Sequence, residues 1–155
     1  MHAGGLVLRA AIGRAGMKNL KREGDGATPI GSFRLTGGFF RPDRFLRPRS
    51  GMKLRGLRPM NGWCDDTSSG QYNRPVRDDT TAGHESLWRE DHVYDVIVLT
   101  DQNLRPRIKG RGSAIFFHLA NQDFAPTAGC VAISAADMRR LLPRLARNAT
   151  LVIRR

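Results

Sequence analysis

Two side chains in the sequence are suited to covalent catalysis. His118 lies near the end of the apolar run Ser113 to Leu119, and Cys130 follows a Thr127-Ala128-Gly129 turn. A free thiol is only a few per cent thiolate at neutral pH, and a neighbouring imidazole that accepts its proton activates it. Because glycine lets the backbone approach closely, the N–H groups near Gly129 and Cys130 are candidates for stabilising an oxyanion. The pattern predicts acyl transfer through a thioester, with Cys130 as nucleophile, His118 as general base and Gly129 contributing its backbone.

The alternative interpretation of this pair is structural. Free cysteine is among the residue types most often buried, and a histidine at a strand end is commonly hydrogen-bonded without a catalytic role. The second cysteine, Cys64, has Asp65 and Asp66 beside it, and negative neighbours raise the pKa of a thiol. We therefore expect Cys64 to be structural. The two cysteines either pair with each other or leave at least one free thiol.

Short β-rich runs bounded by glycine and proline must position these side chains, which predicts a mainly β fold. The runs are Leu6 to Ile12, Ser32 to Leu35, Val93 to Thr100, Ser113 to Leu119, Cys130 to Ile133 and Thr150 to Ile153. One helix is predicted from about Ala135 to Leu142, with Ser134 as its N-cap and Pro143 interrupting its pattern.

The stretch between Gly37 and His92 has no periodic apolar pattern and is rich in Gly, Pro, Asp, Asn and Ser. A long irregular segment of this kind in a small domain often forms a wall or lid of a binding site. We expect it to shape the site. The alternative is an insertion without a functional role.

Composition limits the class of protein. The chain has 155 residues, 40% of them hydrophobic, and 26 Lys and Arg against 14 Asp and Glu give a formal net charge of +12. We expect one domain spanning residues 1–155, and no apolar run approaches the roughly 20 residues of a membrane-spanning helix. No secretory signal is visible at the start of the sequence. The positive charge favours a polyanionic partner, or it reflects an arginine-rich solvated surface.

Two motifs in this order resemble the catalytic domain of the L,D-transpeptidases, also called the YkuD-type fold. The first is the Gly-x-x-x-Thr-Pro-x-Gly-x-Phe segment from Gly24 to Phe33, and the second is the Thr-Ala-Gly-Cys turn with His118 upstream. The resemblance spans roughly Leu6 to Ile153. It implies a β-sandwich-like fold with one clear helix near the C-terminus, a cysteine nucleophile and a histidine base. It implies no metal and no organic cofactor.

The sequence departs from the usual family signature, which reads Ser/Thr-His-Gly-Cys followed two residues later by Arg or Asn. Ala128 and Ala132 stand at the two polar positions, and the interval from His118 to Cys130 is shorter than usual. The pattern is similar to a divergent branch of the family that also carries a polar and aromatic block in its middle. By that resemblance the middle block replaces the missing polar groups. The candidates for substrate contact are Tyr72, Asn73, Arg74, His84, Glu85, Trp88, Arg89 and Thr127.

The residue types in this block fit peptide recognition. Arg74 and Arg89 can hold a carboxylate in a bidentate pair, and His84 with Glu85 can orient a substrate amine. The two aromatic candidates offer flat apolar walls. Each of these side chains can equally belong to a hydrogen-bond network under a long loop.

The resemblance implies a peptidoglycan L,D-transpeptidase. The donor is a stem peptide, attacked between the L-centre of its third-position diamino acid and the following D-alanine, and an amine of a second stem resolves the thioester. If water resolves it, the enzyme is an L,D-carboxypeptidase, and if a free D-amino acid resolves it, the reaction is exchange; the sequence does not separate these. We expect a monomer in the bacterial periplasm or cell envelope, without nucleic acid as a partner.

A non-catalytic basic module that binds nucleic acid or an envelope polymer is the alternative of another class. It predicts salt-dependent binding that is indifferent to Cys130→Ala. Its candidate stacking platform consists of Phe39, Phe40 and Phe45 near Arg41, Arg44 and Arg47. A metal site is not predicted, because unrelated loops would have to bring together His84, His92 and His118.

Overall fold

A computed structural model describes residues 1–80 and 82–155 of the chain. The strands are β1 (His2–Ala3), β2 (Leu6–Val7), β3 (Ala10–Ala11), β4 (Met17–Lys18), β5 (Thr28–Pro29), β6 (Gly31–Phe40), β7 (Leu54–Gly56), β8 (Asn61–Cys64), β9 (Pro75–Arg77), β10 (His84–Ser86), β11 (Val96–Thr100), β12 (Phe116–Leu119), β13 (Val131–Ile133) and β14 (Thr150–Ile153). The helices are α1 (Ala135–Leu141) and the 3₁₀ turn η1 (Leu142–Arg144).

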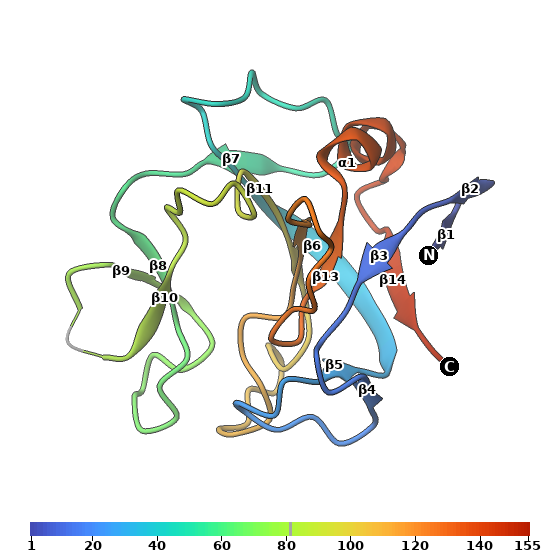
Figure 1. The fold of residues 1–155 in the computed structure, drawn as a ribbon. Helices are drawn as coiled ribbons and strands as arrows, with labels where there is room; N and C mark the ends of the chain where they lie inside the picture. The colour runs from blue at the N-terminus through green and yellow to red at the C-terminus, as the bar shows by residue number, and fades with distance from the viewer. Residues whose placement is uncertain (81) are drawn as a thin grey trace.

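Most of these strands form one large sheet with a smaller sheet beside it. The large sheet has the order β14-β6-β11-β12-β13-β3, with β7 paired to β6, and the small sheet has the order β10-β8-β9. Figure 1 shows the small sheet on one side of the large sheet and α1 on the other. The prediction of a mainly β, sandwich-like fold with a helix near the C-terminus is confirmed.

Strand alternation divides the apolar side chains of β12 between the two faces of the large sheet. Phe117 and Leu119 pack with Met138 of α1 in one core cluster. Phe116 points the other way and packs with Trp63 of β8 in a second cluster. Burying each such side chain contributes roughly 2 kcal/mol. The second cluster packs the small sheet against one face of the large sheet. His118 lies two residues after Phe116 in β12, so its side chain is on that same face.

The helix forms as its capping residues indicate. The Ser134 hydroxyl accepts a hydrogen bond from the Asp137 N–H at 3.0 Å and donates to the Asp137 carboxylate at 2.9 Å. Pro143 lacks the N–H that a continuing helix needs, so the chain tightens into η1. The helix therefore ends one residue earlier than predicted, at Leu141.

Several predicted segments differ from the structure. The strand predicted from Ser32 to Leu35 continues to Phe40, and those predicted from Val93 and Ser113 begin later, at Val96 and Phe116. The run Leu6 to Ile12 is not one strand, because β2 pairs with β1 while β3 pairs with β13. The stretch between Gly37 and His92 is more regular than predicted: it contains the end of β6 and all of β7 to β10. Position 38 in β6 requires glycine, because a Cβ there would overlap the Ile97 carbonyl oxygen of the adjacent strand. In β10 all three residues are half-buried, which leaves no alternation for a sequence pattern to reveal.

Candidate active site

Strand register places Cys130 and His118 on the same face of the large sheet. β12 and β13 run parallel, and His118 pairs with Ala132. Cys130 lies two residues before Ala132, so its side chain points to the same side as that of His118. A strand spacing of about 4.8 Å and a rise of about 3.3 Å per residue put the two Cα atoms roughly 8 Å apart. The thiol and the imidazole therefore face the same side of the large sheet.

Two backbone groups hold the Cys130 thiol. The Sγ donates to the Ala114 carbonyl oxygen at 3.1 Å and accepts from the Phe116 N–H at 3.3 Å. The residue is 8% exposed, and both cysteines of the chain are free thiols. Within the described residues the thiol makes no direct hydrogen bond to His118. Its proton must therefore turn away from Ala114 before the imidazole can accept it.

Asn73 positions the carbonyl that receives the thiol proton. Ala114 lies in the left-handed region with φ of 49°, and its N–H donates to Asn73 Oδ1 at 3.2 Å. The same oxygen accepts from Trp63 Nε1 at 2.9 Å, while Asn73 Nδ2 donates to the Asn103 carbonyl at 2.9 Å. Asn73 is 1% exposed. It lies behind the site and supports it, which differs from the predicted contact with substrate.

The turn before Cys130 depends on Gly129 and Thr28. Gly129 has φ of 143°, and a Cβ there would lie 2.8 Å from the Ala27 carbonyl oxygen. Thr28 Oγ1 donates to the Gly129 carbonyl at 2.9 Å and accepts from the Gly13 N–H at 2.8 Å. The Thr-Pro segment, which carries part of the family resemblance, thus fixes the backbone next to Cys130.

The backbone N–H of Gly129 does not have the predicted free orientation. It donates to Thr127 Oγ1 at 3.1 Å, and the Thr127 hydroxyl in turn donates to the Cys130 carbonyl at 2.7 Å. In the described part of the chain the Cys130 N–H has no hydrogen-bond partner. The Cys130 N–H is therefore the backbone donor that this turn leaves available.

The imidazole of His118 is held in its neutral form. Its Nδ1–H donates to the Leu119 carbonyl at 2.8 Å, which leaves the lone pair on Nε2. The ring of Tyr94 packs edge-on against the imidazole, with centroids 5.1 Å apart. Burial lowers the pKa of His118 to about 4. Burial, with the negative charge of Glu85, raises the pKa of the Cys130 thiol to about 12. The resting pair is therefore a neutral thiol and a neutral imidazole, not a thiolate–imidazolium pair.

A cavity of about 610 Å³ opens over Cys130 and His118. Ser113 and Thr127 line it near the thiol, and the Ser113 hydroxyl is a buried group without a hydrogen-bond partner within the described residues. The charged side chains of the lining are Arg14, Lys21, Arg89, Glu23, Asp65, Glu85 and Asp91. The cavity has the size of a small-ligand site and both signs of charge, which suits a zwitterionic peptide.

The structure brings three of the predicted contact residues to this cavity: Glu85, Arg89 and Thr127. Tyr72 does not line it, because its side chain is buried and its hydroxyl donates to the Glu23 carboxylate. Arg74 is exposed, and its carbonyl accepts the Cys64 N–H within the small sheet.

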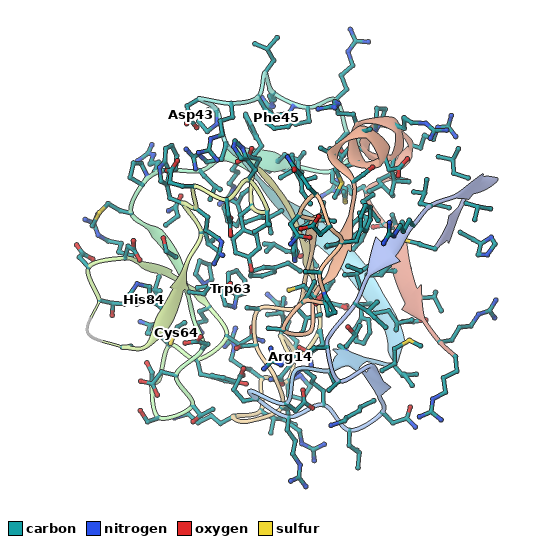
Figure 2. The ribbon with its side chains drawn as sticks, viewed as in Figure 1. Arg14, Asp43, Phe45, Trp63, Cys64 and His84 are labelled. Atoms are coloured by element: carbon teal, nitrogen blue, oxygen red, sulfur yellow. The ribbon has the colours of Figure 1, made fainter. Side chains whose placement is uncertain are left out.

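His84 and Trp88 likewise lie outside the cavity lining. His84 is held by the Ala82 carbonyl at 2.9 Å and by the Asp78 carboxylate. Figure 2 shows Trp63 between the two sheets and His84 farther from the large sheet. The Arg41 guanidinium lies over the ring of Trp88, with its Cζ 3.7 Å from the ring centroid. These positions give both side chains structural contacts in place of the predicted substrate contacts.

A family model for the L,D-transpeptidase catalytic domain matches residues 1–153, which is nearly the whole chain. The chain belongs to the YkuD family. Members of this family are cysteine-dependent transpeptidases that act on peptidoglycan peptides, so the resemblance predicted from two motifs is confirmed. The comparisons with curated proteins and with solved structures each gave no significant match.

In this YkuD domain the two positions that depart from the family signature, Ala128 and Ala132, both line the cavity. Sequence reasoning missed other lining residues, among them Lys21, Ser113 and Tyr94. Lys21 and Ser113 lie in loops that have no periodic pattern. The sequence indicated them only by their position next to a motif or a predicted strand.

The remaining findings concern the residues proposed for base stacking, metal groups, membrane spans and the second cysteine. Two residues of the predicted stacking platform, Phe40 and Arg41, are buried and not free for stacking, and the Arg41 side chain bonds Asp43 at 2.8 Å. In residues 1–80 and 82–155, no group of three or more His, Cys, Asp and Glu side chains is placed to hold a metal ion. Among the same residues no helix is long and apolar enough to cross a membrane. Cys64 is fully buried, as expected of a structural cysteine.

Proposed function

We propose that this YkuD domain is a peptidoglycan L,D-transpeptidase in which Cys130 forms a thioester with a donor stem peptide and His118 is the general base. The observation that carries the proposal is the shared face of β12 and β13. It presents the thiol and the imidazole to one cavity, with the Cys130 N–H available at the turn. The active-site roles of these residues follow from this placement and the family's chemistry.

Acylation follows from the geometry. The Cys130 sulfur attacks the carbonyl carbon at the L-centre of the donor's diamino acid, and its proton passes to Nε2 of His118. The Cys130 N–H donates to the oxyanion that forms. When the tetrahedral intermediate collapses, its C–N bond breaks and the imidazolium protonates the departing D-alanine amine. A thioester remains, and His118 is neutral again.

The neutral resting pair determines the timing of proton transfer. Because burial disfavours both the thiolate and the imidazolium, neither charge accumulates before substrate arrives. The proton therefore moves as the C–S bond forms, when the negative charge passes to the carbonyl oxygen. This requires the substrate to displace the thiol proton from Ala114 toward His118.

An acceptor amine then attacks the thioester and forms the cross-link. We assign cross-linking as the main reaction, with L,D-carboxypeptidase activity or D-amino-acid exchange as reactions of the same thioester. The partners are donor and acceptor stem peptides, and the place of action is the bacterial periplasm or cell envelope. We further propose that residues 1–155 act as one catalytic domain and as a monomer.

The test is product analysis with purified muropeptide tetramers. The wild-type protein is expected to release D-alanine and to form either a cross-linked dimer or a tripeptide. Cys130→Ala should abolish both products, and His118→Ala should slow them by about 10²–10⁴-fold, the usual contribution of a general base. Cys64→Ala is the matched control, since it removes the other thiol without touching the cavity. D-alanine release that survives Cys130→Ala would refute the proposal.

A further inference from the structure

The cavity over Cys130 is acidic although the chain as a whole is strongly basic. The formal net charge of the chain is +12. Among the described residues that line the cavity, three cations face four carboxylates: Glu23, Asp65, Glu85 and Asp91. A local excess of negative charge at a reaction centre attracts a cationic group. The cross-linking acceptor is such a group, because an amine is protonated at neutral pH.

Two of the three lining cations are neutralised by carboxylates: Lys21 by Asp25, which is outside the lining, and Arg89 by Asp91, which is part of it. Lys21 Nζ bonds the Asp25 carboxylate, and Arg89 forms a two-armed pair with Asp91 in which Nε lies 3.1 Å from both carboxylate oxygens. Glu85 has no comparable ion pair in the described residues: its nearest cationic atom is the Arg89 Nη1 at 4.0 Å. Its carboxylate therefore keeps most of its charge available to a ligand.

Glu85 lies one tyrosine side chain away from the proposed base. The Tyr94 hydroxyl donates to Glu85 Oε1 at 2.7 Å, and the ring of the same tyrosine packs against His118. In the small sheet Glu85 pairs with Trp63, whose ring packs edge-on against Phe116 of β12 at 5.2 Å. The carboxylate is thus turned toward the face that carries the nucleophile.

We propose that Glu85 binds the ammonium group of the acceptor and accepts its proton, so that an amine resolves the thioester in preference to water. This inference rests on the proposed function, because it needs the Cys130 thioester. Burial raises the pKa of Glu85, which makes its carboxylate a stronger base than an exposed one, and the charges that face it are Arg89, Asp65 and Asp91. The Tyr94 hydroxyl stabilises the carboxylate in the orientation that the ammonium meets.

The proton balance uses both groups. The ammonium gives one proton to Glu85, and the neutral amine attacks the thioester carbonyl. His118 takes the second proton from the attacking nitrogen as the C–N bond forms. Collapse of the tetrahedral intermediate breaks the C–S bond, and the imidazolium returns its proton to the Cys130 thiolate. Glu85 then releases its proton to water.

The test compares two nucleophiles on one preformed thioester. The enzyme is acylated with a donor tetrapeptide, and transfer is measured to D-alanine amide, which is an ammonium at neutral pH, and to hydroxylamine, which is uncharged there. Glu85→Gln keeps an oxygen that accepts the Tyr94 hydrogen bond but cannot take a proton. The matched control is Asp123→Asn, the same loss of charge on an exposed residue outside the cavity lining.

Glu85→Gln is expected to slow transfer to D-alanine amide by about 10²-fold, the lower end of a general-base effect, and to change transfer to hydroxylamine by less than about threefold. Hydrolysis of the preformed thioester does not require deprotonation of an ammonium, so the product shifts to tripeptide. Equal losses with both nucleophiles, or no loss with either, would overturn the role of Glu85 while leaving the thioester chemistry intact. A wild-type protein that forms no thioester would overturn the proposed function and this inference with it.

Discussion

Replacing Asn73 tests whether this residue supports the site from behind, as its contacts indicate. Asn73→Ala removes the acceptor of two buried donors, Trp63 Nε1 and the Ala114 N–H. Leaving a buried donor unsatisfied costs about 1–3 kcal/mol, and alanine at the φ of 53° found here costs about 1 kcal/mol more. We expect the free energy of unfolding to fall by about 3–7 kcal/mol, a large part of the 5–15 kcal/mol typical of a domain.

Urea denaturation followed by tryptophan fluorescence measures this loss, because Trp63 donates directly to the replaced side chain. Asn73→Gly is the matched variant: it loses the same hydrogen bonds but tolerates the positive φ, so it should be about 1 kcal/mol more stable than Asn73→Ala. In the folded fraction of either variant, kcat for acylation should fall while KM changes little, because the Ala114 carbonyl is displaced but no substrate contact is lost. A loss of stability below about 0.5 kcal/mol, or a change confined to KM, would refute the supporting role.

Three further predictions concern the turn, the base and the helix. Gly129→Ala should lower the free energy of unfolding by about 2 kcal/mol and abolish thioester formation, because its Cβ would lie 2.8 Å from the Ala27 carbonyl oxygen. Thermal melting measures the first effect and intact mass the second. A normal acylation rate would contradict this account of the turn. Burial holds the pKa of His118 at about 4, below its unfolded value of 6.5. Between pH 4 and pH 6.5 the unfolded state therefore binds more protons than the folded state. The free energy of unfolding should fall by up to about 3 kcal/mol as the pH drops from 6.5 through 4. Urea titrations against His118→Gln measure that difference, and parallel pH profiles of the two proteins would contradict it. Ser134→Ala should lower the free energy of unfolding by about 1 kcal/mol, because the hydrogen bond from the Asp137 N–H is lost, and should leave the acylation rate unchanged. A slower rate would show that the helix cap affects the site.

The part of the site built from regular strands was predictable from sequence. The apolar run ending at Leu119 predicted the strand that carries His118, and the glycine turn before Cys130 predicted that the thiol lies at the start of the next strand, which the fold then set beside the first. The capped helix after Ser134 was predictable for the same reason, because cap and periodicity both lie within a few residues.

The contribution of the middle segment was not predictable, because it depends on contacts between residues distant in sequence. Asn73 and Tyr72 carry functional side-chain types, yet they bond Trp63, Ala114 and Glu23 and support the site from behind. Glu85 reaches the cavity only because β10 pairs with β8 in a register that no periodic pattern marks. The orientation of the Gly129 N–H also escaped prediction, since it depends on which acceptor the Thr127 hydroxyl presents.

The identity of the acylated atom tests the central claim most directly. The wild-type protein is incubated with a donor tetrapeptide or a carbapenem, quenched in acid, digested and mapped by mass spectrometry. We predict one adduct, carried by the peptide that contains Cys130. When the donor is the tetrapeptide, hydroxylamine should remove this adduct. The adduct should form much more slowly in His118→Ala. An unmodified Cys130, or an adduct on Cys64 in its place, would contradict the account.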